Sequence, residues 1–597
     1  MRRIVLILCF SACTILPACS RSPDTSTAAE TAAVAPLDER RAQFDALLKE
    51  QWEYTLQHVP ELASILGEKR FNDRWGDLSL QAIQADLEAT RDFLTRFEAI
   101  DTSSFPQQEA LSHQLMVRGL REELDNAKFE NWLMPVNQFF GYHIQVVTLA
   151  SLFPVATVKD YEDYVARLDK LPHQFEQLTE LMRQGMDKRL MPPKLILEQC
   201  VEQAEGLAKS PAQASPFAQA LHKFPDSIAK DDQERIRKTM LTAISGKVQP
   251  AYGKLAAFLR DEYLPHGREE LGLWALPDGD ARYAAEVKQI TTTDMTAEQI
   301  HNIGLREVAR IEAEQAAIGK RLGFDDFEKF KTHVRNDRKL YARNREEILL
   351  LYRQHTAQMY SKLPELFSHF PQQKMTVEAV EAFREKQASG AQYTQGAKDG
   401  SRPGIVRVNT YDPTKRLTVD IESTAYHEGV PGHHMQIAIQ QELGELPSFR
   451  QQARYTAFVE GWALYSERLG KEVGFYQDPY SDYGRLQNEM LRAIRLVVDT
   501  GLHSKHWTRE QVVQYFHDHS TVDEPSVQSE TDRYIAVPGQ ALGYKIGELT
   551  ILRLREKAHQ ALGDKFDIRG FHDAVIGAGA LPLDILEGRI DAWIARH

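Results

Sequence analysis

Five residues of this chain are of the types that bind a metal ion and move protons. His427 and Glu428 are adjacent, His433 and His434 follow shortly after them, and Glu460 comes in a later helical segment. Two neutral imidazoles, one carboxylate and an open fourth position form the ligand set of a catalytic zinc ion. A further carboxylate can serve as the base. The sequence therefore predicts a zinc-dependent peptide hydrolase that binds one zinc ion per chain.

The spacing of the histidines departs from the common H-E-x-x-H pattern. In that pattern the two histidines are four residues apart on one helical face, but here this position is Pro431. On an ideal helix His433 and His434 would lie about 9 and 10.5 Å beyond His427, too far for one ion. Pro431 and Gly432 favour a deformed helix. We expect a bulge at residues 430–432 that returns one of the two histidines, which spacing alone leaves open.

A helix that packs histidine and glutamate for structural reasons alone is the alternative for this segment. Two helix breakers inside a helical pattern disfavour it, because they are costly unless they serve a purpose. The second segment, at 456–472, supplies the missing ligand type. On its helix Glu460 shares a face with Glu467. We interpret Glu467 as a carboxylate that supports the site or lies on the surface.

Substrate contacts are predicted at two places. The alternating β-branched residues of 404–413 and 416–423 indicate strands, and a strand edge beside the zinc helix can hold a peptide. Val408 and Asn409 are the residues that we place nearest the substrate, although an ordinary small sheet explains them equally well. Asp499 and His503 are four residues apart, which suits a carboxylate that orients an imidazole. A polar pair in a cleft wall is the alternative.

The segment RYIAVPGQALGYKIG carries further candidates. A hydroxyl of Tyr544 or Tyr534 that faces the metal can donate to the oxyanion of a tetrahedral intermediate. Arg533 can hold a substrate carboxylate. Both tyrosines can equally be core aromatics.

The N-terminus indicates export. Residues 1–18 combine two arginines with an apolar run and end in Leu-Pro-Ala before Cys19. This segment resembles a bacterial lipoprotein signal peptide, in which Cys19 receives the lipid; the alternative is an ordinary signal peptide. Residues 19–37 are expected to be a flexible tether. The remaining cysteine, Cys200, has no partner for a disulfide and is expected in a helix.

Composition bounds the remaining chain. The net charge of −13 and the lack of a basic patch argue against nucleic acid as a partner. Helical spacing of apolar residues dominates 40–59, 160–186 and 345–367. The predicted fold class is therefore mainly α, with a small β-sheet beside the zinc helix. We expect one domain at 38–597, made of a helical shell at 38–395 and a zinc-site lobe at 396–597, with a loop or mobile flap at 388–404.

The motifs HEGVPGHH, EGWALY, VDTGLH and RYIAVPGQALGYKIG, in this order, resemble the bacterial domain-of-unknown-function 885 family. The resemblance covers most of the chain after the tether. It implies a zincin-like metallopeptidase fold of the gluzincin group with a deep substrate cleft. It also implies that His427 and His433 are the histidine ligands, Glu460 the third ligand, Glu428 the base and Tyr544 the oxyanion donor. The insertion before Gly432 is where the pattern departs from better-understood relatives.

The resemblance implies a peptide substrate and a peptidase of the carboxypeptidase or oligopeptidase type. A lipid on Cys19 would anchor the protein in the bacterial cell envelope, and Ser20 after it favours the outer membrane facing the periplasm. The rival hypothesis is a non-catalytic envelope lipoprotein that binds peptides. Glu428 argues against this rival, because a binding protein needs no base beside the ligands. The sequence leaves the oligomeric state and the natural substrate open.

Overall fold

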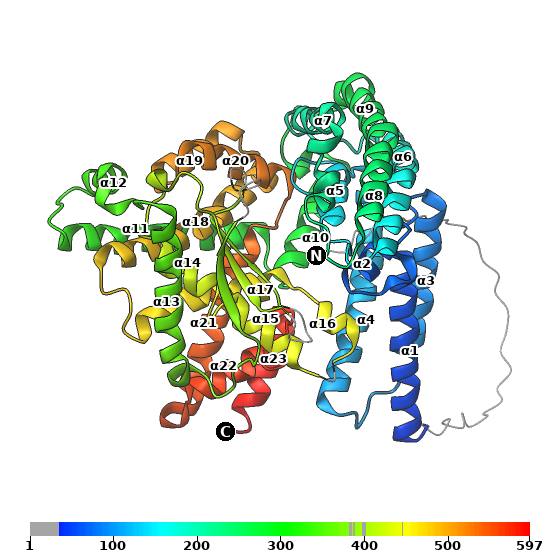
Figure 1. Ribbon diagram of the computed structural model, residues 1–597. Helices are drawn as coiled ribbons and strands as arrows, with labels where there is room; N and C mark the ends of the chain where they lie inside the picture. Colours follow the sequence, from blue (N-terminus) through cyan, green and yellow to red (C-terminus); the bar gives the residue numbers. More distant parts are fainter. Residues whose placement is uncertain (1–34, 381–384, 386–387, 397–401, 445) are drawn as a thin grey trace, which may run out of the picture. The chain divides into compact units, whose positions relative to one another are not determined.

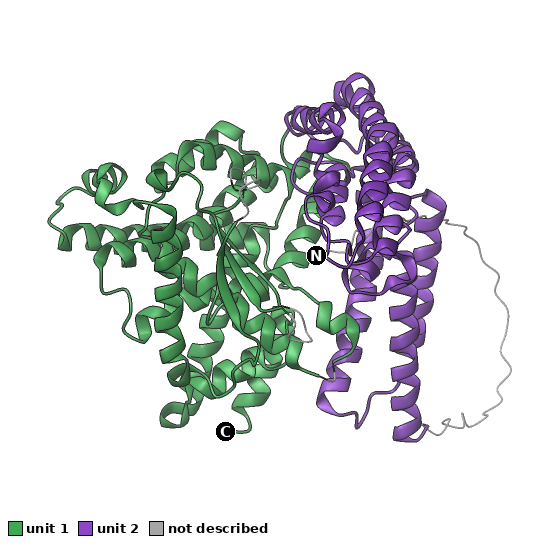
Figure 2. Ribbon diagram, in the orientation of Figure 1, with its two compact units in different colours: residues 1, 271–597 green, residues 2–270 purple. Residues whose placement is uncertain are grey.

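The computed structural model describes residues 35–380, 385, 388–396, 402–444 and 446–597. Cys19 and most of the predicted tether lie outside these residues. The chain divides into two compact units, residues 2–270 and residues 271–597 (Figure 2). The division lies at residue 270, whereas we expected the two lobes to meet near residue 395. Long helices of residues 271–395 pack against the helices of the predicted zinc site, so they belong to the same unit.

The first unit, residues 2–270, is built of helices in the part that the structure describes. Predicted helices at 40–59 and 160–186 are confirmed as α1 and α6, and Cys200 is buried in α7. The helices are α1 Leu37–His58, α2 Pro60–Ile65, α3 Leu80–Glu98, α4 Gln107–Ala127, α5 Tyr142–Ala150, α6 Val158–Asp187, α7 Lys194–Lys209, α8 Lys230–Ala243 and α9 Gln249–Phe258.

The second unit, residues 271–597, contains the predicted metal ligands, and Figure 1 labels its helices. The predicted helix at 345–367 is confirmed as α13. The helices are α10 Gly279–Thr291, α11 Ala297–Arg321, α12 Phe327–Asn336, α13 Arg345–Leu366, α14 Ile421–Glu428, α15 His433–Glu442, α16 Ser448–Gln452, α17 Thr456–Glu472, α18 Pro479–Ser504, α19 Arg509–His519, α20 Glu524–Ala536, α21 Leu542–Leu562, α22 Ile568–Ile576 and α23 Leu583–Ile594.

A small sheet lies among these helices. Its order is β1-β3-β2, where β1 is Met375–Ala379, β2 is Ala391–Thr394 and β3 is Gly404–Val408. β3 runs parallel to β1 and antiparallel to β2. The strand predicted at 404–413 is confirmed in its first half. The strand predicted at 416–423 is wrong, because only an isolated bridge forms at Leu417 and α14 begins at Ile421.

The two outer strands were not predicted as strands. β1 lies in a stretch that we expected to be helical, and β2 lies in the expected loop or flap. Both strands are short. β1 alternates between exposed and less exposed residues around Val377, its only buried residue, but over five residues this pattern is a weak signal, and β2 has no buried residue. Their pairing with β3 is a contact between distant parts of the chain, which local pattern does not reveal.

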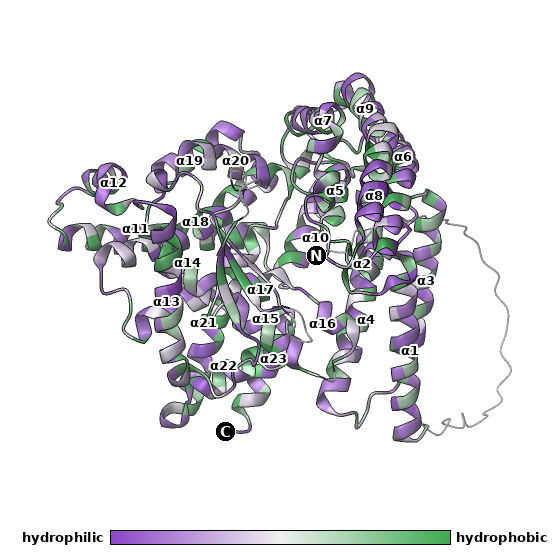
Figure 3. Cartoon of the chain, in the orientation of Figure 1, coloured by the Kyte–Doolittle hydropathy of each residue, from purple (hydrophilic) through white to green (hydrophobic). Residues whose placement is uncertain are grey.

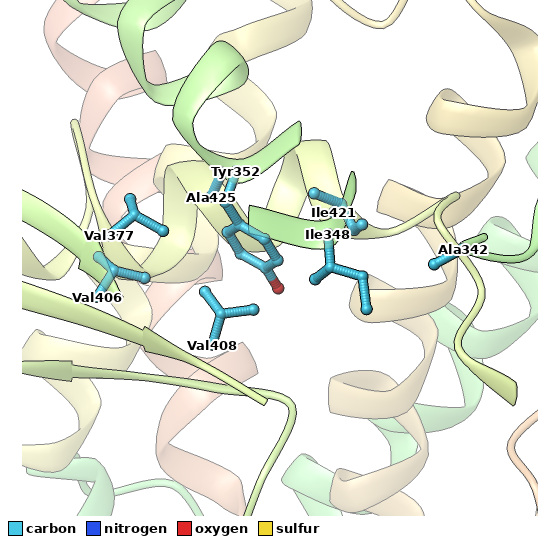
Figure 4. Close-up of a cluster of buried hydrophobic side chains, with 8 residues drawn as sticks. All are labelled: Ala342, Ile348, Tyr352, Val377, Val406, Val408, Ile421 and Ala425. Atoms are coloured by element: carbon cyan, nitrogen blue, oxygen red, sulfur yellow. The ribbon is translucent and has the colours of Figure 1, made fainter. Parts of the chain in front are cut away.

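A hydrophobic layer fixes α14 to the sheet. Tyr352 and Ile348 of α13, Val406 and Val408 of β3, and Ala425 of α14 are buried in one cluster (Figure 4). Burying a large apolar side chain stabilises a fold by about 1.5–3 kcal/mol. This layer therefore holds α14, which ends in the predicted ligand and base, in a defined position beside β3.

The helices carry hydrophilic and hydrophobic residues side by side along their length (Figure 3). Among the described residues, no helix is both long enough and apolar enough to cross a membrane.

Candidate metal centre

The predicted bulge is a complete break between two helices. α14 ends at Glu428 and α15 begins at His433, and a turn joins them. Gly432 lies so close to the preceding helix that a Cβ atom there would sit 2.0 Å from the carbonyl oxygen of His427. The carbonyl of Pro431 accepts a hydrogen bond of 2.8 Å from the indole of Trp462 on α17. The break turns the chain back, so that α15 starts beside the end of α14.

Three of the predicted ligands meet at this break. The Nε2 atoms of His427 and His433 lie 3.7 and 3.5 Å from Oε2 of Glu460, and one donor atom of each residue falls within 4.8 Å of the others. Ligand atoms about 2.0–2.1 Å from a tetrahedral zinc ion are separated by about 3.3–3.5 Å. The two nitrogens, the carboxylate and their spacing therefore fit a zinc ion.

Glu467 supports this cluster through the ring nitrogen of His427 that does not face Glu460. Its Oε1 atom lies 2.8 Å from Nδ1 of His427, and the carboxylate is buried. A carboxylate on Nδ1 fixes the imidazole with its Nε2 lone pair toward the ion and raises the basicity of that nitrogen. Of the two positions that the sequence allowed for Glu467, the structure has the supporting one.

The electrostatics of the cluster favour a positive charge. Burial lowers the pKa of His427, but the carboxylates of Glu460 and Glu467 outweigh it and raise this pKa to about 9. Burial raises the pKa of Glu460, but His427 and His433 outweigh it and hold the pKa well below its ordinary value. The same field that attracts a proton to His427 attracts a metal cation, and the two compete for one lone pair.

His434 lies outside the cluster. Its Nδ1 atom is 3.0 Å from the hydroxyl of Tyr393 on β2. Its Nε2 atom is buried and has no hydrogen-bond partner among the described residues. Of the two histidines that spacing left open, His433 lies in the cluster with His427 and Glu460, and His434 does not.

Glu428 points to the edge of the sheet. Its Oε2 atom accepts a hydrogen bond of 2.7 Å from the backbone N–H of Tyr393. β2 pairs with β3 on one side only, so this N–H belongs to the open edge of β2. The side chain of Glu428 is partly exposed, unlike that of the buried His427 next to it. Glu428 is thus held near the cluster but outside it. Sequence reasoning missed Tyr393, because its role depends on the pairing of β2.

Val408 and Asn409 do not offer a strand edge. β3 is the central strand, and the backbone of Val408 pairs with both neighbours while its side chain is in the core. The side chain of Asn409 donates to the carbonyls of Glu385 and Ala388. The open edge that we assigned to these residues belongs to β2.

Tyr534 and Arg533 form part of a buried ion cluster on α20. The hydroxyl of Tyr534 donates to Glu530 and accepts a hydrogen bond of 3.1 Å from Arg495. Arg533 donates to the same Glu530 at 3.0 Å. Their hydrogen-bonding groups are engaged within the protein, which does not suit the oxyanion and substrate roles that we considered for them.

Asp499 and His503 do not pair with each other. Asp499 accepts hydrogen bonds from the hydroxyl of Tyr283 at 2.6 Å and from the backbone N–H of Gly539 at 3.1 Å. The ring nitrogens of His503 bond the backbone N–H of Leu273 and the carbonyl of Tyr534. His503 is fully buried, so the predicted substrate contact is wrong. Both residues therefore hold neighbouring segments of the chain against α18 through hydrogen bonds.

Tyr544 lies on α21, which packs closely on the helix of Glu460. Gly547 of α21 faces Gly461 of α17 so tightly that a Cβ on Gly461 would lie 2.4 Å from its backbone. Tyr544 is one turn before this contact. Its hydroxyl makes no hydrogen bond to the described residues, while its ring lies against Arg495. A partly exposed tyrosine with a free hydroxyl can donate to a ligand.

Replacing Glu467 with Gln is expected to weaken zinc binding by about 10–100-fold, because an amide supports the imidazole of His427 less well than a carboxylate. Competition with a chelator measures this affinity. Glu472→Gln is the matched control, since Glu472 lies on the same helix but pairs with Arg555 at the surface. Equal affinities of the two variants would show that Glu467 does not tune the site.

The fold and the site together define a class of protein: a mainly helical unit in which two histidines and a glutamate cluster beside a small mixed sheet. Within that class the family is specific. The chain belongs to the family described as "Bacterial protein of unknown function (DUF885)", whose model matches residues 60–590. The resemblance seen in the motifs is thereby confirmed.

Two solved structures are similar to this chain. A protein from Colwellia psychrerythraea, described as a lipoprotein, is 31% identical, with a TM-score of 0.89 over 94% of this chain and 100% of that chain. A protein from Shewanella oneidensis, described as a lipoprotein of unknown function, shares the fold at 17% identity, with a TM-score of 0.73 over 92% of this chain and 99% of that chain. A search of curated proteins finds no match.

Proposed function

We propose that this protein is a zinc-dependent peptide hydrolase of the carboxypeptidase or oligopeptidase type. The observation that carries the proposal is the cluster of His427, His433 and Glu460, with Glu428 held beside it. The three residues would bind one zinc ion through two nitrogens and one oxygen, which leaves a position open. A closed structural site would use four protein ligands instead. The carboxylate of Glu428 has no role in binding the ion, so it is available as a base.

The chain's own residues supply the proton transfers. A zinc ion bound here would contribute Lewis acidity toward a peptide carbonyl and lower the pKa of water to about 7. Glu428 accepts the proton of the attacking water while the C–O bond forms, and it returns that proton to the amine as the C–N bond breaks. The hydroxyl of Tyr544 donates to the carbonyl oxygen as it becomes negative.

The open edge of β2 is the proposed binding place for the peptide backbone. Tyr393 lies on this edge, where its N–H donates to Glu428. An extended peptide that adds a strand to this edge would run past the base, which aligns the scissile bond with the site. The strand is tied to the ligand helix, because Arg454, just before α17, donates to the side chain of Gln395 at 2.6 Å.

A lipid on Cys19 would anchor the enzyme in the cell envelope, at the outer membrane and facing the periplasm. The motif Leu-Pro-Ala-Cys at residues 16–19 and the description of two structural relatives as lipoproteins support this location. A peptidase there would act on peptides of the periplasm.

Metal content and hydrolysis test the proposal together. The purified protein should contain about one zinc ion per chain. It should cleave members of a peptide library, followed by mass spectrometry, lose this activity on chelation and regain it with zinc. Zinc at this ratio without any cleavage would replace the proposal with a peptide-binding lipoprotein. Cleavage that survives complete removal of the metal would contradict the mechanism.

Two adjacent histidines offer a matched pair of variants. His433→Ala should lose most of the zinc, because it removes a donor 3.5 Å from Glu460. His434→Ala should keep most of it, since His434 bonds Tyr393 instead. Metal analysis of both variants, after thermal unfolding has shown that each is folded, measures the difference. The reverse order would mean that the other imidazole is the ligand.

A further inference from the structure

Arg492 of α18 lies level with the end of α14. Two contacts fix how these helices run. A Cβ on Gly484 would meet the backbone of Val419, and Asn488 donates to the hydroxyl of Ser423 at 2.9 Å. The contacts advance by four residues along α18 and by four residues along the segment that runs from Val419 into α14, so α14 and α18 run in the same direction. The next step of this register brings Arg492 to the level at which α14 presents the proposed ligand and base.

The other side of Arg492 faces α21. Its guanidinium carbon lies 5.9 Å from the ring centre of Tyr544, and that of Arg495 lies 4.7 Å from the same ring. α18 and α21 pack against each other around these contacts. Arg492 therefore lies beside the ring of the proposed oxyanion donor, on the helix that packs against both α14 and α21.

The two arginines beside Tyr544 differ in their charge balance. Arg495 forms an ion pair of 2.9 Å with Glu530. Arg492 forms no ion pair with the residues that the structure describes. Its Nη1 atom donates to the carbonyl of Asn488 on its own helix at 3.0 Å, and its Nε atom is buried without a partner.

An unpaired cation in such a position is costly. A buried donor without a partner loses its hydration without compensation, and the loss is greater where the group is charged. Asp420 only moderates this cost: burial raises the pKa of Asp420 to about 6, and the charge of Arg492 opposes this rise without forming an ion pair. A cation kept in this state beside the proposed oxyanion donor is the expected arrangement for a residue that completes its bonds with an anionic ligand.

We propose that Arg492 binds a carboxylate of the substrate, so that the enzyme acts on peptides that carry a negative charge close to the scissile bond. The planar guanidinium matches a carboxylate with two parallel hydrogen bonds, which its Nε and second terminal nitrogen can supply. This inference rests on the proposed peptide hydrolysis. Two sources provide the same chemistry: the free carboxylate of the peptide C-terminus and the side chain of an acidic residue.

Matched peptides distinguish the two sources. One pair differs only in a free or an amidated C-terminus, and a second, amidated pair differs only in Glu or Gln beside the cleaved bond. The parent protein should show a kcat/KM that is about 10–100-fold higher for the charged member of one pair, as a charge-assisted hydrogen bond of about 1.5–3 kcal/mol provides. Arg492→Gln should remove this preference, and Arg492→Lys should restore part of it.

Equal rates for both members of both pairs in the parent protein would overturn the inference, as would a preference that persists in Arg492→Gln. Binding of the same peptides to the Glu428→Gln variant separates this result from the proposed function. Should no peptide be cleaved while the charged peptides still bind better through Arg492, the hydrolase would be wrong and the carboxylate site would stand. Cleavage of the peptides in which Arg492→Gln does not change the preference for charge would instead support the hydrolase and rule out the carboxylate site.

Discussion

Replacing Glu428 with Gln should lower peptide hydrolysis by about 10²–10⁴-fold while the zinc content stays the same. The amide keeps the shape of the side chain and still accepts the hydrogen bond from the N–H of Tyr393 through its oxygen. It cannot accept a proton from water, so the loss isolates the base. Metal analysis and turnover of one peptide on the same sample measure both properties.

Glu460→Gln is the matched control, because it makes the same chemical change 32 residues later in the chain. Here a neutral oxygen replaces an anionic ligand, so zinc binding should weaken and activity should fall with it. The two variants should therefore separate in metal content. Parental hydrolysis by Glu428→Gln with zinc bound would show that this carboxylate is not the base.

The residues that form the cluster could be predicted because their chemistry is local. Histidine and glutamate beside two helix breakers can be recognised without knowing the fold, because Pro431 and Gly432 are costly inside a helix. The form of the deformation was less predictable. A bulge would keep one helix, but the structure ends α14 at Glu428 and starts α15 at His433. The turn is held by Trp462 of a third helix, a contact that no local pattern reveals.

Long-range pairing explains the errors. Asp499 and His503 have the right spacing for a helical pair, but spacing does not tell which neighbours compete for each group. Tyr283 and Gly539 take the carboxylate, and backbone groups take the imidazole. In the same way, a strand pattern at Val408 does not say whether the strand is at an edge. The order β1-β3-β2 places it in the centre.

The expected helical shell shows the same limit. α13 was predicted correctly as a helix, but the element against which it packs was not predicted. α13 packs on α14 through the layer around Tyr352. Helical periodicity gives the buried face of a helix and not the surface that covers it. For this reason we placed the predicted boundary between the two lobes at a change of composition near residue 395, whereas the two compact units divide at residue 270.

The buried lysine of α21 should have a large effect on stability. Lys545 is fully buried, and its Nζ atom lies 2.7 Å from Glu489, 2.6 Å from Glu548 and 3.1 Å from Glu307. Burial lowers the pKa of Lys545, but these carboxylates outweigh it, so the pKa is raised and the ammonium stays charged. Lys545→Met fills similar volume but leaves the carboxylates without this cation. Breaking a buried ion pair by removing one partner costs about 3–5 kcal/mol.

Denaturant unfolding followed by circular dichroism measures this loss. Lys557→Met is the matched control on the same helix, since Lys557 pairs with Asp591 at the surface and its removal should change stability little. The deficit of Lys545→Met should shrink at acidic pH, where protonated carboxyl groups no longer need a countercharge. A deficit equal to that of Lys557→Met would mean that the cluster does not depend on its lysine. A large deficit that ignores pH would instead assign the loss to packing of the α18–α21 contact, on which Tyr544 and Arg492 both depend.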